Sequence, residues 1–345
     1  MQQWTRRKVM GAGAAMGAAI LGGSRLAFGS DAEALYEAAK KEGNLNLYHG
    51  VFDQNTVEGV RAAFQEKYPG ITVSLLRQPA QTIYTKLRLE LQNNITECDV
   101  VQTTNILHFR ELAKIGALLA HAPDGADLVP EAFRTLDSDG NFHLCALSFI
   151  SLNYHSQKVT DPARSWKALL DDRWNGQITV GSPAFSGDVG SWTVAMRAIY
   201  GDDYLRDFAK QKPKVGQSSV DTVTDILAGE RTIGAGAPYS YTLAQKGAGN
   251  PIDVALPEDK AVLNLGVSGV LKTGPHPNAA KLFANFLYTE EYSGVLQKNY
   301  YPTVRADMPW ADGRSLDQIE WHMNDPVTLA DDLAEGIAKW KEIIG

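Results

Sequence analysis

Hydrophobic and polar residues follow two different periods along most of this chain. Apolar residues at helical spacing, such as Leu35, Ala38 and Ala39, predict amphipathic helices, and short apolar or alternating runs predict strands. The predicted helices cover 31–42, 56–68, 83–93, 106–115, 166–170, 192–200, 221–227, 240–246, 278–288, 290–298 and 328–344. The predicted strands cover 45–48, 71–76, 99–103, 142–154, 178–180, 232–235, 252–256 and 262–271. This alternation is typical of a mostly parallel sheet with helices on both faces.

Two predicted β segments are placed so that they join separate parts of the fold. Residues 142–154 are longer than a typical strand, and 252–256 with 262–271 form a second long segment that returns along it. The order predicts an α/β fold of two lobes joined by two crossing β segments. We expect lobe one at 30–147 plus 266–345, lobe two at 153–257, and the hinge at about 148–152 and 258–265. A cleft between such lobes is the default ligand site.

The first 29 residues have the pattern of an export signal. Arg6, Arg7 and Lys8 precede a weakly apolar run at 9–23, and Ala27-Phe28-Gly29 supplies small residues before a cut near Gly29/Ser30. The adjacent arginines indicate the twin-arginine type. The alternative is a membrane anchor, but the uncharged run of 15 residues is shorter than the roughly 20 that a spanning helix needs. We therefore expect a periplasmic mature protein without stable membrane insertion.

Charge and size narrow the class of partner. Removing 1–29, which holds four basic residues and no acidic one, leaves 316 residues with 29 basic and 40 acidic side chains, a net charge of −11. Such a balance argues against nucleic acid and anionic lipid as partners. A chain of this length divides into two lobes rather than enlarging one core. Cys98 and Cys145 are the only cysteines, so a disulfide and two buried thiols both stay open.

The motifs of common enzyme classes do not occur in a suitable context. No GxSxG, HExxH, P-loop or GxGxxG sequence precedes a fitting element, and no Cys/His spacing indicates a metal site. Ser186 has no assignable His and Asp partners. We therefore expect no enzyme and no cofactor, and a secreted hydrolase is a distant alternative.

Several short motifs in order resemble those of a known receptor family. They are 64–73 (FQEKYPGITV), 98–101 (CDVV), 183–187 (PAFSG), 227–230 (LAGE), 276–283 (HPNAAKLF) and 301–305 (YPTVR). With the export signal, they resemble the extracellular solute-binding proteins of ABC importers, in the group of ferric-ion, 2-aminoethylphosphonate, sugar-phosphate and thiamine receptors. The resemblance implies the type II periplasmic-binding-protein fold, a monomer that captures a small molecule by hinge closure, and an ABC permease in the inner membrane as partner.

Ligand groups are expected where strands end at the cleft. The loop at Ser186, Gly187 and Asp188 precedes a helix, so its N–H groups and the Ser hydroxyl suit an anion, although a carboxylate at Asp188 would repel one. Arg77 could pair with a phosphonate or carboxylate. The full set of ligand-binding candidates is His49, Gly50, Phe52, Arg77, Thr104, Asn105, Ser148, Ser186, Gly187, Asp188, Ser218, Tyr239 and Tyr241.

The resemblance also implies roles for individual positions. Ser186 and Gly187 match an anion-holding position of the ferric receptors, and Ser218 lies near another. Tyr239 matches the first of two adjacent iron-binding tyrosines, Ser240 replaces the second, and Tyr241 is one residue further on. Phe52, Thr104 and Ser148 stand where those relatives often have His, Glu and Arg. The favoured ligand is therefore a small organic anion; ferric iron held by Tyr239, Tyr241 and a bound anion is the alternative.

Overall fold

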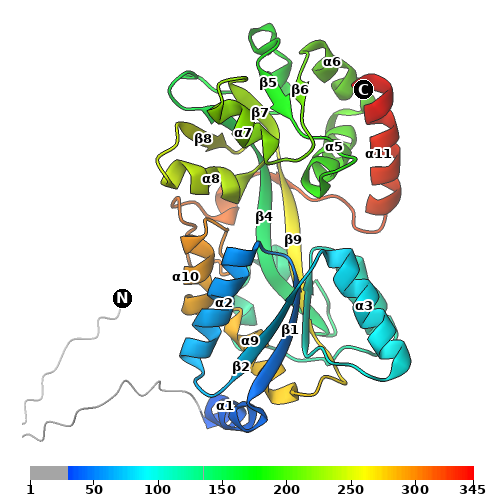
Figure 1. The fold of residues 1–345 in the computed structure, drawn as a ribbon, viewed down its shortest axis with the longest axis vertical. Coiled ribbons are helices and arrows are strands. Elements are labelled where there is room, and N and C mark those ends of the chain that lie inside the picture. Colours follow the sequence, from blue (N-terminus) through cyan, green and yellow to red (C-terminus); the bar gives the residue numbers. More distant parts are fainter. Residues whose placement is uncertain (1–29, 135) are drawn as a thin grey trace, which may run out of the picture.

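The computed structural model of the protein describes residues 30–134 and 136–345, so the predicted export signal lies outside the described residues. Figure 1 shows two groups of helices and strands, one at each end of an elongated molecule. The long strands β4 (Phe142–His155) and β9 (Ala261–Val270) run side by side from one group to the other. We call the group that holds β1 lobe one and the group that holds β5 lobe two.

Lobe one is built from β-α units at the two ends of the chain. Its elements are α1 (Ser30–Glu42), β1 (Asn44–Gly50), α2 (Gln54–Lys67), β2 (Thr72–Arg77), α3 (Ala80–Asn93), β3 (Val100–Thr103), α4 (Ile106–Lys114), α9 (Pro277–Phe286) and α10 (Glu290–Lys298). β2, β1 and β3 are parallel neighbours. Buried aromatic residues such as Phe64, Phe283 and Phe286 hold α2 and α9 together over the sheet.

Lobe two repeats this arrangement with shorter strands. Its elements are β5 (Ile178–Val180), α5 (Gly187–Tyr200), α6 (Asp202–Lys210), β6 (Lys214–Val215), α7 (Asp221–Leu227), β7 (Ile233–Pro238), α8 (Tyr239–Gly247) and β8 (Ile252–Ala255). β7, β5 and β6 are parallel neighbours. A separate buried cluster around Trp166, Trp192 and Phe208 forms the core of this lobe.

The crossing strands make one sheet of both lobes. The strand order is β2-β1-β3-β9-β4-β7-β5-β6, with β8 paired to β4 and β10 (Trp321–His322) paired to β9. β9 runs antiparallel to β3 and to β4, and β4 runs antiparallel to β7 and β8. The two predicted crossing segments are therefore present. The prediction of a mostly parallel sheet is wrong for its middle, because two strands that cross in opposite directions pair with each other.

The C-terminal helix differs from the sequence prediction. α11 (Leu329–Ile343) packs against α5 and α6, and Trp340 lies 2% exposed in the core of lobe two. Figure 1 shows this helix beside α5 and α6, far from α1. The assignment of all of 266–345 to lobe one is thus wrong for α11. The segment at 299–328, here named the C-terminal connection, makes a third passage between the lobes, and Trp340 anchors the helix that follows it.

Smaller elements complete the described part of the chain. α6 and β6 were not predicted, and the predicted helix at 166–170 is a 3₁₀ turn. The 3₁₀ turns are Ala126–Leu128, Glu131–Phe133, Lys167–Leu170, Asp172–Trp174 and Leu316–Gln318. Cys98 and Cys145 are free and buried. Among residues 30–134 and 136–345, no helix has the length and apolar character to cross a membrane.

Candidate functional site: a cleft between the lobes

A cavity of about 430 Å³ lies where the two lobes face each other. Cavities of roughly 300–1,000 Å³ are usual for small-molecule sites. Its wall combines both lobes, the crossing strands and the start of α11. The lining residues are Val51, Phe52, Thr104, Ala146, Ser148, Phe149, Ser186, Gly187, Asp188, Ser191, Pro238, Tyr239, Ser240, Tyr241, Asn264, Leu265, Gly266, Tyr301 and Leu329. Eight predicted site residues are thus brought to one cavity, named here the solute cleft.

The lobe-one wall of the cleft is an aromatic loop that is held in place by side chains outside the cavity. Phe52 is 2% exposed, lines the solute cleft and packs edge-on against Tyr301, with ring centroids 4.9 Å apart. Its N–H donates to Nε2 of His49 at 2.7 Å, and its carbonyl accepts from Nε of Arg77 at 2.8 Å. His49 and Arg77 therefore fix the Phe52 peptide on both sides. The structure places neither of them on the cavity wall, so their predicted contact with a ligand is not part of this arrangement.

Three further predicted residues also have local structural roles. A Cβ at Gly50 would lie 2.9 Å from Cα of Ala80, so glycine allows β1 to approach the start of α3. Asn105 caps α4, because its side chain accepts from the N–H of Leu107 at 3.0 Å. The Ser218 hydroxyl donates to Oδ1 of Asp221 at 3.2 Å, on the loop before α7. Gly50, Asn105 and Ser218 are not among the residues that line the cleft.

The N-terminus of α5 forms one part of the lobe-two wall. Ser186 is its N-cap, and its hydroxyl accepts from the N–H of Val189 at 3.4 Å. A Cβ added at Gly187 would meet no atom within 4 Å, so the backbone here is open to a ligand. The first N–H groups of a helix have no intrahelical acceptor and carry a partial positive charge. This end of the cleft is therefore suited to an acidic group.

Asp188 is the charged side chain among the lining residues. Its Oδ2 accepts from the Ser219 hydroxyl at 3.0 Å, and burial raises the pKa of the carboxyl above its ordinary value. The side chain is half-buried, and a half-buried ionised carboxylate with one protein donor is stabilised by a further donor. Asp188 therefore favours a ligand that brings a hydroxyl or an ammonium group.

The N-terminus of α8 forms the other part of the lobe-two wall. Tyr239, Ser240 and Tyr241 are its first residues, and all three line the cleft. Tyr239 is 1% exposed, and its hydroxyl donates to Oδ2 of Asp312 at 2.5 Å. Burial, followed by the hydrogen bond and charge of Asp312, raises the pKa of Tyr239 well above its usual range. Tyr239 thus lines the cleft while its neutral hydroxyl binds a residue that does not; Tyr241 is exposed.

Two polar residues that line the cleft, Ser191 and Asn264, were not predicted as site residues. Asn264, on β9, accepts from the Ser191 hydroxyl at 2.8 Å, and Asn324 of the C-terminal connection donates to the same Ser191 oxygen at 3.0 Å. A single amide inside the apolar run of 261–270 was the signal that could have identified Asn264. Tyr301 was noted only as part of a motif. Its hydroxyl donates to Oδ2 of Asp53 at 3.3 Å, which ties it to the lobe-one loop.

The donors of the cleft do not form a ready metal site. Across residues 30–134 and 136–345, no group of three or more His, Cys, Asp and Glu side chains is placed to hold a metal ion. Ferric iron prefers deprotonated oxygen ligands, and the raised pKa of Tyr239 opposes its deprotonation.

Comparison with solved structures supports the same architecture. The chain is similar to the periplasmic binding protein AfuA of Actinobacillus pleuropneumoniae with fructose-6-phosphate bound, at 19% identity and a TM-score of 0.68 over 88% of this chain and 98% of that one. It is equally similar to iron-bound HitA of Pseudomonas aeruginosa, at 20% identity and a TM-score of 0.69 over 87% and 99%. A putative extracellular solute-binding protein from Bordetella parapertussis gives 18% identity and a TM-score of 0.73 over 88% and 100%. At these identities the likeness shows the fold, which is the expected type II one.

Sequence comparison identifies the family of the chain. An uncharacterized protein of Haemophilus influenzae is 23% identical over 245 residues, which are 68% of this chain and 70% of that protein. Residues 108–322, more than half of the chain, match the model of the bacterial extracellular solute-binding proteins. The chain therefore belongs to this family of bacterial extracellular solute-binding proteins, which are non-enzymatic receptors.

Proposed function

We propose that this receptor captures a small organic anion, with a phosphonate, phosphate ester or carboxylate group, and delivers it to an ABC permease. One observation carries the proposal: the N-termini of α5 and α8 both open into the solute cleft, through Ser186 and Gly187 and through Ser240 and Tyr241. Two helix N-termini at one cavity concentrate N–H donors and partial positive charge, which stabilise an acidic group.

The other lining groups define what accompanies the acidic group. No lysine or arginine is among the described residues that line the cleft, so backbone N–H groups and the hydroxyls of Thr104 and Ser148 would supply the donors. Asp188 would take a hydroxyl or ammonium of the ligand. The rings of Phe52 and Tyr239 would cover its carbon skeleton. Phosphorylated polyols and aminophosphonates combine these features.

Contacts from both lobes would couple binding to closure. Phe52 and Thr104 belong to lobe one, whereas Ser186 and Gly187 belong to lobe two, so a bound solute would join the two lobes. A ligand that contacts both walls favours the conformation in which they are near. The proposed hinge is the part of β4 and β9 between the lobes, at about 148–152 and 258–265.

Ferric iron with a bound anion is the alternative. Its support is the fold shared with iron-bound HitA, and Tyr239 and Tyr241 are the ligands it would use. The same fold is shared with AfuA, whose structure holds fructose-6-phosphate. The hydrogen bond from Tyr239 to Asp312 favours the organic anion, because iron would have to displace both the proton and the carboxylate.

The remaining parts of the proposal concern export and assembly. We propose a twin-arginine signal at 1–29, cleaved near Gly29/Ser30, that releases a monomeric receptor into the periplasm without stable membrane insertion. Fractionation of cells that express the full chain, with Arg6→Lys and Arg7→Lys as the variant, tests this route. Periplasmic protein that survives the double substitution would contradict the twin-arginine assignment.

The ligand class is tested by thermal unfolding of residues 30–345, refolded to remove carried-over solute. The probes are fructose 6-phosphate, 2-aminoethylphosphonate, citrate, thiamine and ferric citrate. A ligand that binds only the folded state raises the melting temperature as its concentration exceeds Kd. We expect a shift with an organic anion and no coloured iron complex. A shift with ferric citrate alone, together with a visible tyrosinate band, or no shift with any organic anion, would contradict the proposal.

A further inference from the structure

The hydroxyl of Tyr239 is held by a group that lies outside the solute cleft. Its acceptor, Asp312, belongs to the C-terminal connection and is not among the residues that line the cleft. The hydrogen bond therefore joins the first residue of α8, in lobe two, to the C-terminal connection, whose Trp310 packs in the same buried cluster as Tyr239 and Phe149. It fastens α8 to the C-terminal connection at a residue that lines the cleft.

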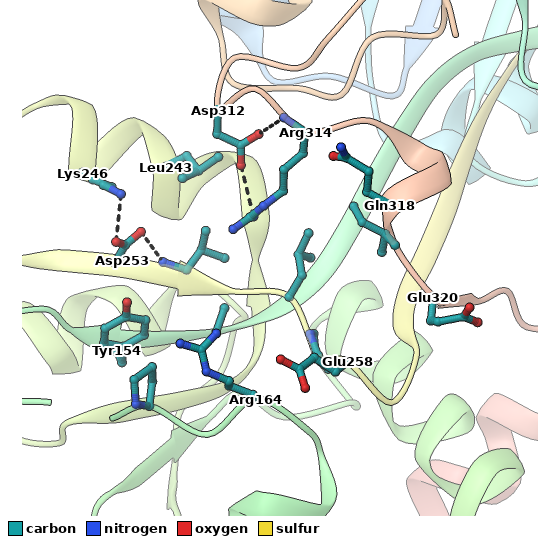
Figure 2. A pocket seen from close by; sticks show the side chains of 16 residues that line it. Tyr154, Arg164, Leu243, Lys246, Asp253, Glu258, Asp312, Arg314, Gln318 and Glu320 are labelled. Carbon is teal, nitrogen blue, oxygen red and sulfur yellow. Dashed lines mark hydrogen bonds and ion pairs between the residues drawn. The ribbon is translucent and has the colours of Figure 1, made fainter. Parts of the chain in front are cut away.

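Asp312 is in turn fixed by a basic neighbour. Nη1 of Arg314 lies 3.1 Å from Oδ2 of Asp312, and the backbone N–H of Arg314 donates to Oδ1 at 3.2 Å. Both side chains line a second cavity of about 470 Å³, enclosed by α8, β8, the loop at 256–258 and the C-terminal connection. Figure 2 shows the Asp312–Arg314 pair on one side of this cavity and the Lys246–Asp253 pair on the other.

The ring of Tyr239 is fixed by aromatic contacts as well. It packs edge-on against Trp310, with centroids 6.1 Å apart, and against Phe149 at 6.3 Å. Phe149 and Trp310 also contact each other, at 5.3 Å. These contacts restrain the position of the ring, whereas rotation of its hydroxyl end is opposed by Asp312. A buried phenol that loses its acceptor is destabilised, so removing Asp312 would favour an orientation of Tyr239 in which the hydroxyl finds another partner.

We propose that Asp312 is a positioning residue of the solute cleft: it holds Tyr239 from outside, so that the ring, and not the hydroxyl, faces the solute. Arg314 orients Asp312 for this purpose. The inference rests on the proposed function, since it assigns Tyr239 as a wall of an organic-ligand site. It adds that Asp312 of the C-terminal connection, which does not itself line the cleft, determines the shape of the cleft through Tyr239.

The variants for the test distinguish the loss of the Tyr239–Asp312 hydrogen bond from a general loss of stability. Asp312→Ala removes the acceptor, Asp312→Asn keeps an oxygen that accepts the Tyr239 hydroxyl, and Tyr239→Phe removes the donor while keeping the ring. The double variant Asp312→Ala/Tyr239→Phe completes a cycle. Asp325→Ala is the control, because Asp325 is exposed on the same connection and its side chain accepts only the local N–H of Val327 among the contacts that the structure gives it.

The first readout needs no ligand. Fluorine NMR of the refolded mature chain labelled with 5-fluorotryptophan gives a resonance for Trp310, assigned by Trp310→Phe. We expect Asp312→Ala and Tyr239→Phe to displace or broaden this resonance, the double variant to add nothing further, and Asp312→Asn and Asp325→Ala to leave it nearly unchanged. A Trp310 resonance that stays in place in Asp312→Ala would overturn the proposal.

The second readout is affinity for fructose 6-phosphate or for 2-aminoethylphosphonate. We expect Asp312→Ala and Tyr239→Phe each to weaken binding about tenfold, with no further loss in the double variant, because they break the same interaction. Additive losses would contradict the proposal. If neither probe binds the unmodified receptor, the organic-anion function fails, while the Trp310 spectrum still decides whether Asp312 positions Tyr239.

Discussion

Nε2 of His49 accepts a hydrogen bond of 2.7 Å from the backbone N–H of Phe52. Since this nitrogen accepts, the proton of the neutral ring is on Nδ1, which lies 2.8 Å from Oε1 of Gln102 and donates to it. The imidazole is buried, and desolvation lowers its pKa to about 4. His49 thus acts as a neutral connector that fixes one wall of the cleft, and not as a cation that meets the ligand.

Protonation of His49 should destabilise the fold. Its folded pKa of about 4 lies below the ordinary value of 6.5, so the unfolded chain binds a proton first as the pH falls. The contribution of neutral His49 to the free energy of unfolding is fully present above pH 6.5 and is lost as the pH falls from there towards 4. The loss for this one group is about 3 kcal/mol. Urea unfolding of the mature chain, repeated across this range, measures the loss.

His49→Gln provides the comparison for that measurement. The variant should be less stable at pH 7 by about 1–3 kcal/mol, because a Gln amide cannot place an acceptor at the Nε2 position and a donor at the Nδ1 position together, so one of the two hydrogen bonds is lost. Its stability should then fall less steeply below pH 6.5. His108, whose pKa is also lowered to about 4 by burial, remains in both proteins and gives them a common background. If the free energy of unfolding depended on pH in the same way in both proteins, the lowered pKa of His49 would be refuted.

Asp188→Asn should separate stability from binding. Burial raises the pKa of this carboxyl, so its ionised form is unfavourable above its unfolded pKa, and the neutral amide should leave stability at pH 7 unchanged or higher. Affinity for 2-aminoethylphosphonate should fall about tenfold or more, since a hydrogen bond to a charged group contributes about 1.5–3 kcal/mol. Inorganic phosphate, which has no ammonium, should bind the variant at least as well. Calorimetric titration checks both.

Gly187→Trp should block the cleft without harming the fold. A side chain at Gly187 starts in open space, on the first turn of α5 and at a position that lines the cleft. Ser186→Trp should also abolish binding, but it removes the helix N-cap as well. The matched control is Gly294→Trp, because a Cβ at Gly294 on α10 also meets no atom within 4 Å. Ligand-induced thermal shifts lost in Gly294→Trp, or kept in Gly187→Trp, would contradict the site assignment.

Trp340→Ala should weaken lobe two specifically. Trp340 lies in the core of that lobe beside Trp192, with ring centroids 6.3 Å apart. Truncating a buried tryptophan costs about 3–5 kcal/mol. Hydrogen exchange should rise in α5 and α6 and stay unchanged in α2 and α9, whereas the exposed Lys341→Ala should have no effect. Faster exchange in lobe one alone would show that α11 belongs there.

The local periodicity of the sequence was enough to predict most of the helices and strands, because they have clear apolar faces, whereas the type II fold was implied by the family resemblance. The placement of α11 was not predictable in this way. Its apolar residues indicate a helix but do not distinguish between two cores of similar character. The antiparallel pairing of β4 with β9 likewise depends on contacts between residues more than a hundred positions apart.

The candidate site was predicted in part for the same reason. Ser186, Gly187 and Tyr239 follow strand ends, and a strand end can be located from the sequence alone. Arg77 follows one too, yet it turns to the Phe52 carbonyl. Which way a strand-end side chain points depends on the tertiary contacts available to it, as the bond between Tyr239 and Asp312 also demonstrates.

Three passages of chain join the lobes, and this number limits how they can move. The paired β4 and β9 form a narrow ribbon that bends readily, and on its own such a ribbon would also allow one lobe to twist about the long axis of the molecule. The C-terminal connection runs beside this ribbon, where β10 pairs with β9, and then attaches to lobe two through Asn324 and α11, which packs on α5 and α6. With two separate attachment points, one lobe cannot easily twist relative to the other. Bending about the ribbon is then the main motion that opens and closes the cleft. Each opening should therefore return the cleft walls to the same alignment.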